Sequence, residues 1–84
     1  MTYQQFSNRF TRLLNKVFDQ EMYDRFILAN SMLEPGESIL DKFMPTVEHF
    51  GSVNQVQAYK QLVELIKTNP GYRKVMHYVS SAKA

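Results

Sequence analysis

Chemistry in this chain would have to rest on two histidines and eight carboxylates, because cysteine is absent. His49 and His77 are the residues that could act as bases near neutral pH. Nucleophilic catalysis also needs a nucleophile beside the base, and no serine stands in a strand–turn–helix elbow. The pair Glu48-His49 lacks the second histidine four residues along that a helical zinc site requires. We therefore predict that the protein is not an enzyme and has no metal ion or cofactor.

Basic residues form two groups that could lie along a phosphate backbone. The first group is a stripe near the start of the chain: Arg9, Arg12 and Lys16. The second group stands near the end: Lys67, Arg73, Lys74 and His77. Tyr72 and Tyr78 accompany the second group and could stack on bases. A small nucleic-acid-binding regulatory protein is therefore the alternative function that the sequence leaves open.

The charges are unevenly placed along the chain. Residues 1–20 carry a net charge of +2, residues 21–50 carry −4, and residues 51–84 carry +4. This pattern has two interpretations. In one, the two basic ends pack beside an acidic middle; in the other, each end offers a basic surface to a partner.

Four helix-start signals divide the chain. Thr2 to Gln5 and Ser52 to Gln55 both match a capping box, Ser38 to Asp41 is a weaker version, and Asn69 precedes a proline at a first helical position. Apolar residues then recur at spacings of three and four. The expected helices cover residues 3–18, 20–33, 38–50, 53–67 and 70–80, with a turn at 34–37 and a frayed tail at 79–84. We predict an all-α fold, a compact bundle of four to five short helices in a single domain spanning residues 1–84.

Two residues in the middle of the chain complicate this pattern. Pro45 falls inside the third helix, where a proline loses a backbone hydrogen bond and clashes with the preceding turn. We expect a kink there, or a short turn over 38–44 followed by a new helix from Pro45. Gly51 matches the left-handed position that follows many helix ends.

Apolar residues cover more than half the circumference of the second helix. Such a helix must be central in the fold or covered by a partner. We predict a non-enzymatic protein–protein interaction module that holds an amphipathic partner helix in an apolar groove on helices one and two, or that forms a homodimer through the same groove. The predicted contact residues are Tyr23, Ile27, Leu28, Met32 and Met44, with Arg9, Arg12 and Lys16 steering acidic flanks of the partner.

Two stretches carry a resemblance to known interaction domains. Residues 14–27 (LNKVFDQEMYDRFI) join a lysine-containing amphipathic helix to a second helix with Tyr23 and Phe26 three apart, and residues 62–72 (LVELIKTNPGY) end in a proline turn. This arrangement resembles the paired-amphipathic-helix domains and the related harmonin-homology domains. The resemblance implies a bundle of four or five helices that binds an amphipathic helix from a partner, often a nuclear regulator.

No long apolar segment is present. The longest uninterrupted apolar run covers residues 26–29, whereas a membrane-spanning helix needs ~20 such residues. Residues 1–20 contain polar and charged groups throughout, which is unlike the core of a signal peptide. We expect a soluble intracellular protein, cytoplasmic or nuclear.

Overall fold

The computed structural model describes residues 1–72, and this part of the chain is all-α. Its elements are α1 (Tyr3–Val17), α2 (Gln20–Ser31), α3 (Ile39–Phe50), α4 (Val53–Thr68) and the short 3₁₀ turn η1 (Pro70–Tyr72). The predicted fold class is therefore confirmed. The rest of the expected closing helix and the tail at 79–84 lie outside the described residues.

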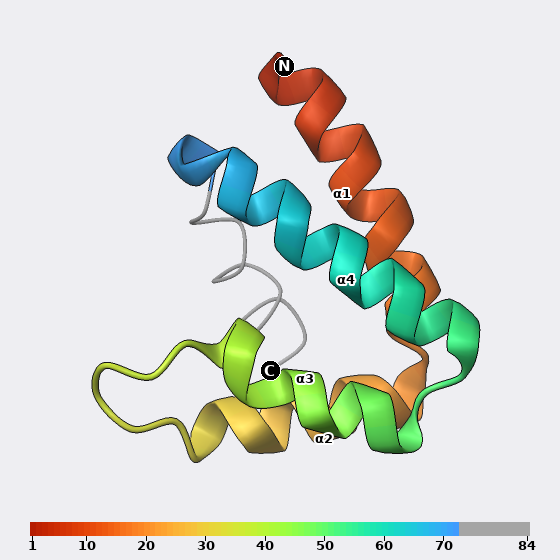
Figure 1. Cartoon of the computed structure of the whole chain (residues 1–84), viewed down its shortest axis with the longest axis vertical. Helices are drawn as coiled ribbons and strands as arrows, with labels where there is room; N and C mark the ends of the chain where they lie inside the picture. Colours follow the sequence, from red (N-terminus) through yellow and green to blue (C-terminus); the bar gives the residue numbers. More distant parts are fainter. Residues whose placement is uncertain (73–84) are drawn as a thin grey trace.

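The four helices form two antiparallel pairs (Figure 1). The first and last helices, α1 and α4, pack against each other, and α2 packs against α3 to form a hairpin closed by residues 32–38. Gly36 has a φ of 86° in this connection, which is the conformation that the Pro-Gly turn predicts. The two basic ends of the described chain thus lie side by side, and the acidic middle forms the other pair.

Local capping sets most of the helix starts. Both predicted capping boxes are present, because the Gln5 amide N–H donates to Thr2 Oγ1 (3.2 Å) and the Gln55 N–H donates to Ser52 Oγ (3.2 Å), with the glutamine side chains accepting in return. Asp19 caps α2 by accepting from the Met22 N–H at 2.8 Å. The weaker box does not form, since Ser38 precedes α3 without a side-chain hydrogen bond.

Two predictions about helix ends and breaks need correction. One helix, α3, runs through Pro45, so no new helix starts there. Gly51 has φ −85° and ψ 155°, an extended conformation and not a left-handed one. The need for a glycine here is steric, because a Cβ at position 51 would lie 2.5 Å from the carbonyl oxygen of Val47. The Asn69 side-chain amide donates to the Leu65 carbonyl at the end of α4 (2.9 Å), and η1 begins at the following Pro70, as the sequence predicts.

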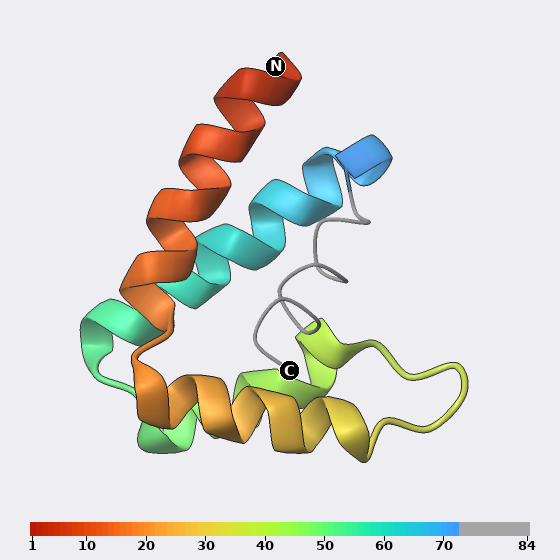
Figure 2. The ribbon, with the colours of Figure 1, turned by 180° about the vertical axis from the view of Figure 1, so that it is seen from behind.

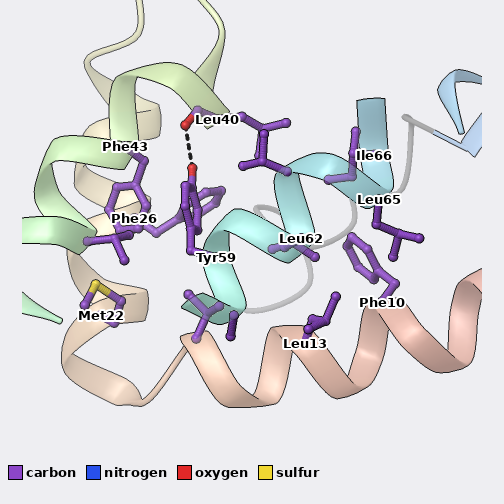
Figure 3. Packing of buried hydrophobic residues seen from close by; sticks show 14 of the residues in the cluster. Phe10, Leu13, Met22, Phe26, Leu40, Phe43, Tyr59, Leu62, Leu65 and Ile66 are labelled. Carbon is purple, nitrogen blue, oxygen red and sulfur yellow. Dashed lines mark hydrogen bonds between the residues drawn. The ribbon is translucent and has the colours of Figure 1, made fainter. Parts of the chain in front are cut away.

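The core joins the two pairs through aromatic rings (Figure 3). Phe43 on α3 is fully buried, with its ring centroid 5.2 Å from that of Phe26 and 5.9 Å from that of Tyr59. Tyr59 comes from α4 and donates its hydroxyl hydrogen to the Leu40 carbonyl of α3 at 2.6 Å. This bond satisfies a polar group inside an otherwise apolar core, as buried hydroxyls require.

Candidate binding surfaces

Two exposed apolar side chains lie on one line along α2: Leu28 within the helix and Met32 at its C-cap. Leu28 is 62% exposed and Met32 is 63% exposed, whereas Phe26 on the inner face is 1% exposed. At 100° per residue, these two side chains share a face with Glu21 and Arg25. We call these four residues the outer stripe of α2. Figure 2 shows α2 in front, with its last turns leading away from α1.

Phe50, the last residue of α3, extends this surface. The Arg25 guanidinium lies over the Phe50 ring, 4.1 Å from its centroid, and the Phe50 side chain is 54% exposed. The contact is a cation–π interaction that places Phe50 beside the outer stripe. The sequence pattern did not predict Phe50 as a contact residue. Its contact with Arg25 exists only once α2 and α3 are paired, and no local pattern contains that pairing.

Three of the predicted contact residues lie elsewhere. Tyr23 is 7% exposed and meets Phe18 edge to face at 6.2 Å, so its assignment to a partner surface is corrected. Ile27 and Met44 are half-buried and pack against the core. The buried apolar residues of α1 pack mainly against α4, so they do not supply the exposed floor of a groove shared with α2. Most of the wide apolar face of α2 packs instead against α3, its partner in the hairpin.

The surroundings of the outer stripe are acidic. Residues 19–50 contain seven acids and two bases, a net charge of −5. Both bases are already paired, because Arg25 lies 3.9 Å from Glu21 and Lys42 lies 3.1 Å from Glu37. The Glu34 N–H and then the Lys42 ammonium hold the pKa of Glu37 below its usual value.

The predicted basic stripe lies on the other helix pair. Arg9, Arg12 and Lys16 are exposed on one face of α1, a helix without acidic residues, and they line hollows between α1 and α4. Three hollows adjoin one another around Gln61, and one of them has a volume of about 530 Å³. We call these three adjoining hollows and the residues that line them the α1–α4 seam. Its polar lining is completed by Gln5, Asn8, Asn54, Gln57, Gln61, Glu64, Thr68 and Asn69.

The second basic group is not part of the seam. Lys67 lines a separate hollow with Asp41, between α3 and the end of α4. Arg73, Lys74 and His77 lie outside the described residues. The structure therefore brings the three cations of α1 together with α4, and it does not join them to Lys67.

Residues 1–72 contain no cluster of three potential metal ligands among His, Cys, Asp and Glu. His49 in this range is exposed, and its ring contacts that of Phe50 with centroids 4.6 Å apart. No helix in the described range is long and apolar enough to cross a membrane. The absence of enzymatic activity stays a prediction.

Comparison with known proteins gave no match. No protein-family model, no curated protein and no solved structure matches the chain. The resemblance to paired-amphipathic-helix and harmonin-homology domains therefore stays a prediction, and function has to be argued from the surfaces themselves.

Proposed function

We propose that this chain is a non-catalytic protein-binding module whose contact surface is the outer stripe of α2 together with Phe50. The observation that carries the proposal is the exposure of Leu28 and Met32 on one line of a helix whose inner residues are almost fully buried. Isolated exposed apolar residues are ordinary, but two large ones in line beside an exposed aromatic form a surface of the kind that partners bury.

The expected gain comes from apolar burial. Covering Leu28 and Met32 would contribute about 1 kcal/mol or more each, on the scale of burying a whole aliphatic side chain. Methionine adapts its shape to the partner, and the Arg25–Phe50 pair adds a flat, partly rigid edge.

Charge narrows the chemistry of the partner. Glu21, Asp24 and Glu48 are exposed on the same hairpin, whereas Arg9, Arg12 and Lys16 lie on the other helix pair. An amphipathic helix with basic flanks therefore fits this surface better than the acidic-flanked helix expected from the sequence. A two-fold homodimer is the less favourable variant, because it would bring the acids of both copies to one interface.

Affinity capture from a lysate of the source organism tests the proposal with three baits. The wild-type chain should retain a discrete protein whether or not the lysate is treated with nuclease. Leu28→Asp combined with Met32→Asp should lose that protein, because two carboxylates would enter an apolar contact. Both sites are exposed, so the melting curve of the double variant should stay close to that of the wild type.

Val53→Asp is the matched control. Val53 is 73% exposed at the first turn of α4, away from the outer stripe, so this bait should retain the protein. Equal retention by all three baits would refute the assigned surface. Unfolding of the double variant would instead mean that Leu28 and Met32 belong to the core.

A further inference from the structure

We propose that the α1–α4 seam is a second binding site, which takes the phosphate backbone of single-stranded nucleic acid without reading its base sequence. This site lies on the opposite helix pair from the outer stripe of α2, so it does not depend on the proposed protein-binding function. The proposal rests on the charge of the seam, on its unused side-chain amides and on the burial of the apolar side chains at its base.

The cations of the seam are available. Arg9, Arg12 and Lys16 form no ion pair within residues 1–72, although both bases of the α2–α3 hairpin do. The one acid that lines the three hollows is Glu64. A row of unpaired cations keeps its full attraction for phosphates and releases counterions when they bind.

The spacing of the cations suits a single strand. The intervals of three and four residues along α1 correspond to rises of about 4.5 and 6 Å. Cations at such steps can each meet a separate phosphate of one backbone. A single row also matches one backbone and not two.

Amide groups on the α4 side supply further hydrogen bonds. Asn54, Gln57 and Gln61 line the seam, and their side-chain amides make no hydrogen bond within the described residues. Asparagine and glutamine are common donors to phosphate and sugar oxygens, which position a strand without reading bases. The lining in the described part contains no aromatic ring, so stacking would not select bases there.

The same lining argues against an acidic helix as the occupant. The apolar side chains at the base of the seam, Leu13, Ala58 and Leu65, are 3–6% exposed, because α1 and α4 already cover them. A helix in a groove gains its affinity from a row of exposed apolar side chains. Met1, which is 58% exposed, is the one exposed apolar residue among those that line the three hollows in the described part of the chain. A polyanion that binds through its charges is the better fit.

Fluorescence anisotropy with a labelled short oligothymidylate tests this site directly. Three phosphate contacts predict a slope of about −2 for log K against log salt, so affinity should fall roughly 20-fold between 50 and 200 mM salt. Arg9→Gln, Arg12→Gln and Lys16→Gln should each reduce the slope by ~0.7. Glutamine keeps a good helix propensity, so these exposed positions should remain helical.

Lys60→Gln is the matched control, because Lys60 is an exposed cation of α4 outside these three hollows. It should leave the slope unchanged, and so should Leu28→Asp with Met32→Asp. No binding at 50 mM salt, or an equal loss with the Lys60 variant, would overturn the proposal. Polyglutamate that competes as well as the oligonucleotide would also overturn it and would reassign the seam to acidic polypeptide.

Discussion

At the scale of single residues, Gln55 holds three helix ends together. Its Oε1 accepts from the Ser52 N–H at 2.8 Å, which closes the capping box of α4. Its Nε2 donates to the Val17 carbonyl at the end of α1 (2.9 Å) and to Asp19 Oδ2 at the start of α2 (3.3 Å). The sequence predicted the first contact, because a capping box is local. The other two join residues 36 and 38 positions apart, and no local pattern contains them.

Gln55→Glu should therefore be destabilising. The carboxylate can still accept from Ser52, but it cannot donate to Val17, and it faces the carboxylate of Asp19. We expect a loss of about 1–2 kcal/mol in the free energy of unfolding, measured by urea denaturation. Asn54→Asp makes the same chemical change one residue earlier at an exposed site and should not destabilise the fold. Equal effects of the two variants would contradict the role of Gln55.

Tyr59 is the buried polar residue whose loss should be most informative. Tyr59→Phe keeps the ring and removes the hydroxyl, so the Leu40 carbonyl loses its 2.6 Å partner. We expect a cost of about 1–2 kcal/mol at neutral pH in urea denaturation. An unchanged unfolding free energy would mean that water replaces the hydroxyl.

The same residue predicts an alkaline limit to stability. Burial, followed by the nearby carboxylate of Asp41, raises the pKa of Tyr59 well above its ordinary value of about 10. The stability that depends on its neutral phenol is complete below pH ~10 and is lost as the pH rises further, because the unfolded chain can ionise there. Above pH 10, the free energy of unfolding of Tyr59→Phe should therefore fall less steeply with pH than that of the wild type, as measured by circular dichroism.

At the scale of elements, the helices divide into those set by local signals and those set by packing. Thr2 and Ser52 fix two helix starts through hydrogen bonds between residues three positions apart, so the sequence predicted them. In contrast, α3 continues through Pro45, although local sterics favour a break there. Leu40, Phe43 and Val47 are all buried on one side of this helix, and their packing outweighs the proline.

Replacing this proline should stabilise the protein. Pro45 is exposed, so an alanine at this position restores a backbone donor without disturbing the core. We expect Pro45→Ala to raise the free energy of unfolding by about 1–2 kcal/mol, after allowing for the greater freedom of the unfolded chain. Glu48→Ala, an exposed change in the same helix, should alter stability by less than about 0.5 kcal/mol. Destabilisation by Pro45→Ala would show that α3 depends on the fixed φ of proline.

At the scale of the whole molecule, charge separates along the two helix pairs. Residues 1–18 and 51–72 contain five bases and one acid, a net charge of +4, against −5 for residues 19–50. The sequence contains this division, but it did not show whether the basic ends pack against the acidic middle or form a separate basic surface. The structure places α1 on α4, which gathers the cations of α1 in one seam and leaves the acids around the outer stripe of α2.

This arrangement explains which site residues were predictable. The exposed positions of Leu28, Met32 and the three cations of α1 were predictable, because exposure on an amphipathic helix follows from spacing. Tyr23 and Ile27 were wrongly predicted to be exposed. The apolar face of α2 is wide, and its pattern does not show which of its residues Phe18 and α3 cover. Phe50 and Gln61 were missed because each joins its surface only through another helix.

The most direct measurement of the central claim is amide chemical-shift mapping of the labelled chain as the protein retained by the wild-type bait is added. The proposed function predicts the largest shifts along Glu21, Arg25, Leu28 and Met32 and at Phe50, with little change along Arg9 to Lys16. Shifts confined to α1 and α4 would contradict it, because the partner would then occupy the seam and not the outer stripe of α2.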